Sequence, residues 1–555
     1  QDTIWSGDSL KLTITYTPYD VGNEDAWRML ISSNGGAQDT INLYGSGQPV
    51  ITPSMIIYMP ADLTTSGDSL GTLAELQAKI DNDEILPGAS IRFEKGGVWT
   101  VRGTDSCGLN LTSLSGTVDS FIIFESYGTG TNKPRFDFTG TNDMFEIHNA
   151  KYLRFDGLAW WNSGTWSRTT SPRFAIACMD ARTTSDTIKY IEVNNCLINN
   201  VGGGFYINSN AMVHNISFLK DSILNTRNVP AIGSGDGQGC GINIRRYVGV
   251  GYQDTVTVDS CVFVNNGGTG DTGGNEHGIY FGASNKNLTV TNSTFSESPT
   301  NGGGGVTLAG GSNITIANNT FTNLVKGVII TPAQANSGRI DSVFVYNNSF
   351  TTSSTSSYAG IDINALTAYT NNLTNYVKIY NNLFYNLSTA AGVNVENIDS
   401  LSNVLIANNN FVNCYGSVGA FRHKYSRPNY ASNNRILNNI FFNNVNDAPL
   451  LYFQGKGISD VQSDWTTINY NLYYKTAGTT YFNVNETKYT SVAEFVAASP
   501  YEDNGVLSNP LFMDVDNRDY RLSITSPKDN GANLTSDGIT TDFEGNSRPY
   551  NTIFD

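Results

Sequence analysis

Short segments in which apolar side chains alternate with polar or small ones recur through the middle of the chain. Each begins with Gly and continues with two apolar residues that are separated by one other residue. Such alternation turns one set of side chains toward a core and the other toward an outer face, as in a β-strand. The pattern therefore predicts a stack of short strands with one shared buried face. The copies are GFYIN (204–208), GINIR (241–245), GIYFG (278–282), GVTLA (305–309), GVIIT (327–331), GIDIN (360–364) and GVNVE (392–396).

A second repeat places an Asn two or three residues after an apolar strand and three residues before a Phe. A period of this length fits one coil of three short strands of about 4–5 residues and three turns. Asn tolerates the left-handed backbone of a tight turn, and its amide can hydrogen-bond to copies about 4.8 Å away in neighbouring coils. The chain is thus predicted to be all-β, a three-sheet parallel β-helix. The column contains Asn292, Asn318, Asn347, Asn381, Asn408 and Asn438, at spacings of 26, 29, 34, 27 and 30 residues, and Asn195, Asp221 and Ser260 extend it upstream.

Composition and charge limit the function classes. The formal net charge of −16 argues against nucleic acid and against insertion into or binding to an anionic membrane. Any polyanionic ligand would need a local basic patch. No apolar run reaches about 18 residues, so no transmembrane helix is expected. The six cysteines are scattered without a CxxC pair and are predicted to be small buried apolar residues, not disulfides or metal ligands.

The Asn column, the Gly-led strands and the coil length together resemble the pectate-lyase-like superfamily of right-handed parallel β-helices. The resemblance implies a secreted or cell-surface carbohydrate-active protein. It also implies a site on the sheet that carries the Gly-led strands, between the long loops that precede them.

The segments that flank the coils resemble parts of other secreted proteins. Residues 8–47 resemble the latter half of an immunoglobulin-like bacterial surface module, a small β-sandwich-like segment, so we expect the native chain to begin earlier. Residues 509–548 resemble the closing segment of secreted bacterial β-helix proteins. The amphipathic stretch 69–80 predicts a helix that caps the first coil, because the end of a solenoid needs covering. The predicted regions are a partial immunoglobulin-like module (1–50), a linker with the capping helix and first coils (51–140), β-helix coils (141–475) and a C-terminal capping segment (476–555).

One candidate region for substrate binding lies on the strands near 241 and 278. The segment NEHGIYFGAS resembles the His-Gly strand motif of pectin hydrolases, and it places His277 and Tyr280 on the strand. The preceding coil lacks the paired aspartates of that family, and no Arg-Ile-Lys follows, so a pectin hydrolase is not predicted. Arg245 is a natural ligand for a carboxylate or sulfate, or else a solvated strand residue. His277 either contributes to the site or packs beside a loop.

A second candidate region follows from placing Phe421 beside Val395 and Ile363. This alignment puts Asp362 and Asn394 in one outer column. We expect Asn394 to bind substrate.

The next outer column then holds Asn364, Glu396 and Arg422, with His423 and Lys424 at the strand edge. Arg422 and Lys424 are predicted to bind substrate, and His423 to take part in catalysis. The alternative is that Glu396 and Arg422 form an ordinary surface ion pair worth about 0–1 kcal/mol.

Asp362 and Glu396 would be one coil and two residues apart, with their Cα atoms about 8 Å from each other. Carboxyl groups at such a separation can act as acid and base, or as acid and nucleophile, in glycoside hydrolysis. Arg422 would keep Glu396 ionised while the other carboxyl could hold its proton. The first prediction is therefore a glycoside hydrolase acting on an acidic or sulfated polysaccharide.

Two other functions stay open on the same residues. A polysaccharide lyase would use His423 or Lys424 as the base and Arg422 to neutralise a uronate, with calcium possible on loop carboxylates. A non-catalytic adhesin or glycan-binding β-helix is the third, because a fold alone does not give function. No resident cofactor or metal is otherwise predicted, and the protein is expected to be a monomer.

Overall fold

The computed structural model of the chain describes residues 25–32, 38–45, 55–61, 70–102, 107–140, 142–165, 171–180, 187–209, 212–227, 239–246, 253–267, 277–282, 285–297, 304–332, 339–352, 359–364, 372–387, 391–396, 398–414, 416, 418–425, 430–443, 445–523 and 530–549. Within the first fifty residues, β1 (Asp25–Ser32) and β2 (Gln38–Gly45) form an antiparallel pair. The immunoglobulin-like module stays a prediction, because most of residues 1–50 lie outside the described ranges.

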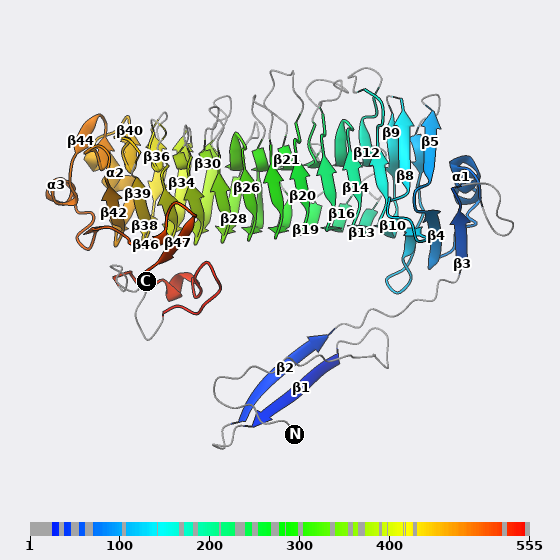
Figure 1. Ribbon diagram of the computed structural model, residues 1–555, viewed down its shortest axis with the longest axis horizontal. Coiled ribbons are helices and arrows are strands. Elements are labelled where there is room, and N and C mark those ends of the chain that lie inside the picture. The colour runs from blue at the N-terminus through cyan, green and yellow to red at the C-terminus, as the bar shows by residue number, and fades with distance from the viewer. Residues whose placement is uncertain are drawn as a thin grey trace.

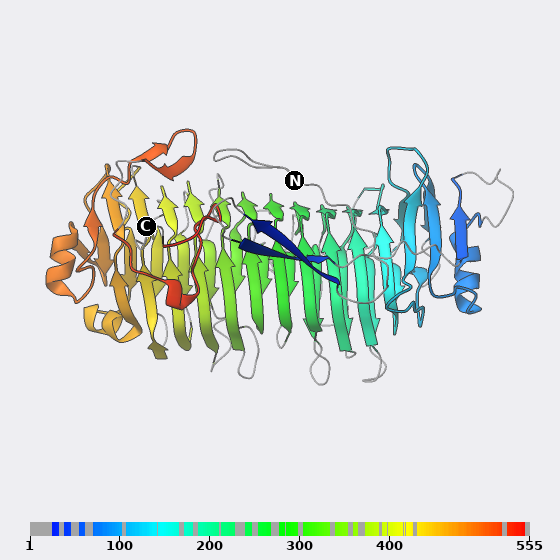
Figure 2. The same ribbon diagram turned by 90° about the horizontal axis from the view of Figure 1, so that it is seen from below.

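Three long sheets of stacked, almost entirely parallel strands make up the body of the molecule, as Figures 1 and 2 show from two directions. Successive strands of the chain pass from one sheet to the next, so that each coil adds one strand to each sheet. This confirms the prediction of a right-handed, three-sheet parallel β-helix. Parallel pairing starts at β3 (Met55–Met59) and reaches β45 (Val506–Leu507), so the coils extend beyond 141–475 at both ends.

The strands are assigned to sheets as follows. Sheet I contains β3, β4 (Ala89–Glu94), β7 (Ile122–Tyr127), β10 (Lys151–Asp156), β13 (Thr187–Asn194), β16 (Met212–Leu219), β19 (Gln253–Asp259), β22 (Lys286–Thr291), β25 (Gly311–Ala317), β28 (Arg339–Tyr346), β31 (Leu373–Tyr380), β34 (Ser400–Ala407), β37 (Tyr430–Ser432), β38 (Asn434–Leu437) and β41 (Trp465–Asn469). Sheet II contains β5 (Val98–Arg102), β8 (Arg135–Thr139), β11 (Ala159–Trp161), β14 (Leu197–Asn199), β17 (Ser222–Leu224), β20 (Val262–Val264), β23 (Thr294–Ser296), β26 (Thr320–Thr322), β29 (Ser349–Thr351), β32 (Leu383–Tyr385), β35 (Asn410–Val412), β39 (Ile440–Asn443), β42 (Leu472–Lys475) and β45. Sheet III contains β6 (Cys107–Asn110), β9 (Asp143–Ile147), β12 (Phe174–Asp180), β15 (Gly203–Ser209), β18 (Ile242–Arg246), β21 (His277–Phe281), β24 (Gly304–Leu308), β27 (Lys326–Ile330), β30 (Ala359–Asn364), β33 (Ala391–Glu396), β36 (Phe421–Lys424), β40 (Leu451–Gln454), β43 (Phe482–Val484) and β44 (Thr487–Tyr489).

The repeated Asn turns have the left-handed backbone that the sequence predicts. Asn318 has φ 58° and Asn347 has φ 54°, and the other predicted Asn positions have similar values. At the upstream end the prediction is wrong by one residue, because Lys220 (φ 58°) and not Asp221 takes the left-handed turn. The left-handed residue turns the chain, and the residue after it points into the core.

That following residue forms an interior hydrogen-bond ladder, so the axial amide contacts lie one position later than predicted. Asn348 is typical: its Oδ1 accepts the backbone N–H of Asn319 at 2.9 Å, and its own N–H donates to Asn382 Oδ1 at 3.0 Å. The Asn348 amide also donates to the Ile316 carbonyl at 2.9 Å, so every polar atom of a fully buried side chain is satisfied. The ladder contains Cys196, Asp221, Cys261, Ser293, Asn319, Asn348, Asn382, Asn409, Asn439 and Asn471, and it ends on Glu502.

A second interior column is aromatic. Phe321, Phe350 and Phe384 stack with ring centroids 4.8 Å apart, which is the spacing of neighbouring coils. The Gly that leads each strand of sheet III from β18 to β33 makes room for this column: a Cβ on Gly360 would lie 2.7 Å from the Phe384 ring and 2.8 Å from the carbonyl oxygen of Gly392. The Gly-led motif therefore reflects the packing of one sheet against the aromatic column of another. All six cysteines are buried, as predicted.

Both ends of the coil stack are covered. The predicted capping helix is present as α1 (Leu73–Asp81), which begins with a capping box between Thr72 and Glu75. Gln77 of this helix hydrogen-bonds to the backbone N–H and carbonyl of Asn110 on the edge strand β6, at 2.8 and 3.0 Å. At the other end lie α2 (Ile458–Asp464) and α3 (Val492–Ala498), and Phe495 of α3 stacks on Phe482 at 4.2 Å.

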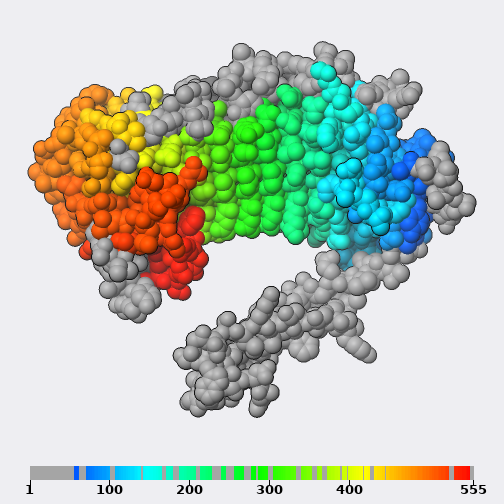
Figure 3. All heavy atoms as spheres, in the orientation of Figure 1, coloured from blue at the N-terminus to red at the C-terminus, as the bar shows by residue number. Residues whose placement is uncertain are grey.

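After the last coil the chain folds back along the helix. We call residues 509–523 and 530–549 the C-terminal strap; it includes β46 (Phe512–Asp514), β47 (Asp519–Leu522) and the 3-10 turn η1 (Thr535–Asp537). Tyr520 packs among apolar side chains on the outer face of sheet II, whereas Leu534 and Ile539 pack on the outer face of sheet I. The strap thus crosses the edge between these two sheets, and Figure 3 shows it lying against the late coils.

Candidate functional site

The outer face of sheet III carries one continuous column of mostly polar side chains. It is built by the residue between the two apolar positions of each Gly-led strand, so strand alternation alone points these side chains outward. Both candidate regions from the sequence therefore lie on the same face of the same sheet. The column runs through Asn243, Tyr280, Thr307, Ile329, Asp362, Asn394, Arg422 and Tyr452.

The register that the sequence suggested for β36 is wrong by two residues. Phe421 lies beside Val393, not beside Val395. The cause is visible at the start of the strand. A Cβ on Gly392 would lie 2.9 Å from the carbonyl oxygen of Ala420, so Ala420 takes the place in its coil that a Gly holds in the earlier ones. Without that Gly, the sequence does not mark where the strand begins.

The corrected register changes the neighbours of three candidate residues. Arg422 lies beside Asn394, and Lys424 lies beside Glu396. His423 lies beside Val395 and faces the core. The two cations therefore remain on the outer face, and the imidazole does not.

His423 is a core residue. It is 1% exposed, and its Nδ1 accepts the indole N–H of Trp465 at 3.1 Å. Burial lowers its pKa to about 3, with the nearby charge of Lys456 acting in the same direction, so the imidazole is neutral. The predicted catalytic role of His423 does not fit this position, because a substrate on the outer face cannot reach the ring.

Asp362 forms an ion pair, and its carboxylate is almost completely buried. Its Oδ2 lies 2.6 Å from Lys326 Nζ, and its Oδ1 accepts a hydrogen bond from Asn394 Nδ2 at 2.7 Å. The Asp362 side chain is only 2% exposed. The predicted neighbourhood of Asp362 and Asn394 is confirmed, but both Asp362 oxygens already have partners.

Glu396 lies one coil and two residues from Asp362, as predicted. Its Oε2 is 3.0 Å from an Arg422 terminal nitrogen and 3.9 Å from Lys424 Nζ. The Nε of Arg422 also donates to Gln454 Oε1 at 3.3 Å. The ion pair between Glu396 and Arg422 is confirmed, and it forms diagonally across neighbouring coils.

Four further polar residues of this face were not identified from the sequence. The Tyr452 hydroxyl donates to Glu486 Oε1 at 2.6 Å, and burial together with this carboxylate raises the pKa of Tyr452 to about 12. Lys326 stands directly before a Gly-led strand and could have been found there, whereas the strand LYFQ (451–454) has no Gly to mark it. We call the assembled group the polar cluster: Lys326, Asp362, Asn394, Glu396, Arg422, Lys424, Tyr452, Gln454 and Glu486.

The other candidate region is packed more tightly. His277 is buried, its Nδ1 accepts the backbone N–H of Gly304 at 3.1 Å, and its ring stacks against Tyr280 with centroids 5.8 Å apart. Arg245 lies on β18 in register with Asn208, and its side chain lies outside the described residues. The substrate-binding roles of Arg245, His277 and Tyr280 stay predictions.

Metal ligands and membrane-spanning helices are the two remaining expectations. No group of three His, Cys, Asp or Glu side chains in these ranges is arranged as metal ligands would be. Calcium on loop carboxylates stays a prediction, because several of the loops beside sheet III lie outside those ranges. None of the helices in the described ranges has the length and apolar character needed to cross a membrane.

No protein-family model and no curated protein sequence matches the chain. Among solved structures it is similar to a mannuronic acid-specific polysaccharide family 6 lyase from human gut microbiota, with a TM-score of 0.47 and 12% identity over 82% of this chain and 92% of that one. It is similar to the tailspike protein of an E. coli bacteriophage, solved with a pentasaccharide, with a TM-score of 0.45 and 13% identity over 81% and 75%. It is also similar to a surface adhesin of Streptococcus pneumoniae, with a TM-score of 0.43 and 15% identity over 77% and 91%. Likeness at this level carries no conclusion about what this chain binds or cleaves.

Proposed function

We propose that the polar cluster binds an acidic, uronate-containing polysaccharide and cleaves it by β-elimination. The observation that supports this is the paired exposure of two cations on the outer face: the Arg422 and Lys424 side chains are 16% and 39% exposed. Both cations also contact Glu396, so a substrate carboxylate would bind beside that residue, on the exposed sides of Arg422 and Lys424. A guanidinium can bind a carboxylate with two parallel hydrogen bonds.

In this reaction Arg422 pairs with the uronate carboxylate and makes the neighbouring C5 proton easier to remove. Lys424 takes that proton as the base, after its own ammonium proton has passed to solvent. The electron pair of the C5–H bond forms a C4=C5 double bond as the C4–O bond to the leaving sugar breaks. The leaving oxygen takes a proton from water or from the Tyr452 hydroxyl, which its high pKa keeps protonated.

The predicted hydrolase remains the second candidate, supported by the register that puts Asp362 and Glu396 one coil and two residues apart. A general acid of a hydrolase must carry a proton and touch the glycosidic oxygen. Here both carboxylates lie in ion pairs, and Asp362 is almost closed off. For hydrolysis, the ion pair between Lys326 and Asp362 must therefore break so that Asp362 can reach the substrate. The proposed elimination does not use Asp362 and leaves this ion pair in place.

The deciding experiment is a screen of the purified protein against uronate-containing and sulfated polysaccharides, with reducing ends and ultraviolet absorbance followed together. A lyase produces both signals, because the C4=C5 double bond is conjugated with the carboxylate. We expect Arg422→Ala to reduce kcat/KM about 100- to 1,000-fold. Asp503→Asn, on the surface near the end of the coils, serves as the matched control.

Reducing ends without absorbance would reject elimination and support the hydrolase. The next variants would then be Asp362→Asn and Glu396→Gln. Binding without either signal would support the adhesin. The secreted or surface location and the monomeric state remain proposals, to be tested by cell fractionation and light scattering.

A further inference from the structure

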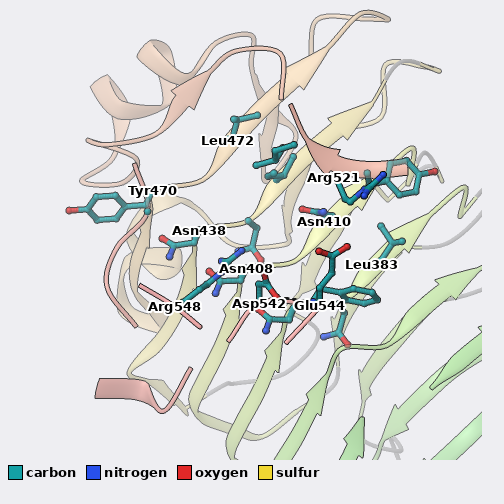
Figure 4. Close-up of a pocket in the computed structure, with 18 of the residues that line it drawn as sticks. Leu383, Asn408, Asn410, Asn438, Tyr470, Leu472, Arg521, Asp542, Glu544 and Arg548 are labelled. Atoms are coloured by element: carbon teal, nitrogen blue, oxygen red, sulfur yellow. Dashed lines mark hydrogen bonds between the residues drawn. The ribbon is translucent and has the colours of Figure 1, made fainter. Parts of the chain in front are cut away.

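A cavity of about 700 Å³ lies between the C-terminal strap and the late coils. None of its lining residues belongs to sheet III; they come from the strap, from sheet II and from the Asn turns that lead into sheet II. Figure 4 shows Asn408 and Asn438 on the coil side and Asp542, Glu544 and Arg548 on the strap side. Pockets of about 300–1,000 Å³ are typical of small-molecule sites. This cavity is therefore separate from the polar cluster.

The base of the cavity is formed by three consecutive members of the Asn turn column. The strap satisfies the outer two. Asn381 Nδ2 donates to the Thr541 carbonyl at 2.8 Å, and Asn438 exchanges two hydrogen bonds of 2.8 Å with the backbone of Ala532. Asn408, between them, has neither its Oδ1 nor its Nδ2 hydrogen-bonded, although both atoms are buried. A buried amide without partners is unfavourable, so this one calls for an occupant of the cavity.

The strap contributes an aromatic ring and a carboxylate next to each other. Phe543 is 48% exposed although it lines the cavity. Among the described residues, the Glu544 carboxylate has no ion-pair partner within 4 Å. By contrast, Asp542 accepts hydrogen bonds from the backbone N–H groups of Glu544 and Asn546 at 2.9 and 2.8 Å, and so stabilises the turn that it begins.

The charges that line the cavity balance. Arg521 is paired with Asp519 at 2.5 Å, and the remaining charges are of both signs. A charged ligand would therefore find no net attraction. The charged lining residues are Arg518, Arg521, Arg548, Asp519, Asp542 and Glu544.

We infer that this cavity binds a neutral saccharide of one or two pyranose rings. An Asn amide offers a donor and an acceptor side by side, and a carboxylate offers two acceptors, which together match adjacent sugar hydroxyls. The torsion that orients the amide is broad, so Asn408 can turn toward an occupant. Phe543 supplies an apolar surface for the C–H face of a ring. The site thus differs in charge preference from the polar cluster, and it does not depend on the reaction proposed there.

The test is binding of cellobiose, lactose and N-acetyl-D-glucosamine to the whole protein, by calorimetry and saturation-transfer NMR, with D-glucuronate as the charged probe. We expect at least one neutral probe to bind more tightly than D-glucuronate. Asn408→Gly removes the amide and keeps the left-handed turn (φ 53°), and it should weaken binding about tenfold. Phe543→Ala should weaken binding similarly without touching the coils.

The matched control is Asn318→Gly, which changes the same turn (φ 58°) three coils earlier and outside the cavity. A second control is Arg422→Ala, which should leave binding of the neutral probe unchanged. The inference is overturned if no neutral probe binds, or if both cavity variants bind as wild type. It is also overturned if Asn318→Gly or Arg422→Ala abolishes binding, because the probe would then bind at another site. Binding of D-glucuronate as tight as that of the neutral sugars would overturn it as well.

Discussion

Asp221 provides a sharp test of the interior ladder, because it is a carboxyl with an uncharged ladder residue on each side, Cys196 and Cys261. It is 1% exposed, and its Oδ1 accepts the backbone N–H of Cys196 at 2.7 Å. Its Oδ2 has no hydrogen-bond partner. In the same place of the ladder, the Asn348 amide nitrogen donates to the carbonyls of Ile316 and Tyr346, both at 2.9 Å. Asp221→Asn should therefore put a donor where the ladder calls for one.

The size of the effect depends on pH. Burial raises the pKa of Asp221 well above its ordinary value, so the folded protein keeps this proton to a higher pH than the unfolded chain does. As pH rises above about 4, the unfolded chain loses this proton while the folded chain keeps it, and wild-type stability falls. An Asn has no such cost. We expect Asp221→Asn to stabilise the protein by at least about 1 kcal/mol at neutral pH, because a difference of one pKa unit between the folded and unfolded carboxyl corresponds to a free energy of about that size.

The assay is denaturant unfolding of wild type and Asp221→Asn at pH 4 and at pH 8, with the exposed Asp503→Asn as control. The stability gain should be small at pH 4 and large at pH 8, and the control should show neither. A variant that is less stable than wild type at pH 8 would refute the reasoning. So would a gain of equal size at both pH values, because it would not come from the proton.

Three further outcomes follow from the geometry. Burial raises the pKa of Glu502, at the end of the ladder, from 4.5 to about 7. The free energy of unfolding of the wild type should therefore fall by about 3 kcal/mol between these pH values, and Glu502→Gln should flatten that part of a pH-stability curve. An unchanged curve would show that the carboxyl is not held neutral. Gly360→Ala should lower the free energy of unfolding by about 1–3 kcal/mol in a thermal or denaturant experiment, because the new methyl group would lie 2.7 Å from the Phe384 ring. Unchanged stability would mean that the Phe rings can shift to make room. Tyr452→Phe should lower kcat of the proposed elimination about 100-fold with little change in KM, and a wild-type kcat would assign the proton to water.

The fold could be predicted from the sequence because each coil repeats the same local solution. A Gly leads each strand of sheet III from β18 to β33 to admit an aromatic ring, and an Asn takes the left-handed turn before sheet II in the coils from Asn292 to Asn438. The interior ladder was harder to locate, since several turns contain two Asn residues in succession, as at Asn318 and Asn319. Only the backbone dihedral tells which of the two turns the chain and which points inward.

The candidate site could be predicted only on strands that begin with the Gly-led motif, because the leading Gly shows where the strand starts. Asp362, Asn394 and Glu396 lie where the pattern put them, because β30 and β33 both begin with this motif. β36 does not, and a shift of two residues there turned His423 from an exposed base into a core residue held by Trp465. That contact joins residues 42 positions apart in the chain, so no local pattern could have indicated it.

The interior ladder also predicts the order in which the coils should unfold. Between coils, each ladder residue bonds only to the coil before and the coil after, so the ladder is a row of nearest-neighbour links. Loss of order at one end frees one link at a time, whereas a break in the middle costs two. Backbone amides near β3 and β45 should therefore exchange with solvent first, and those of the central coils last. Replacing Asn382, in the middle of the row, with Ala would split one cooperative stack into two shorter ones, each of which would melt on its own.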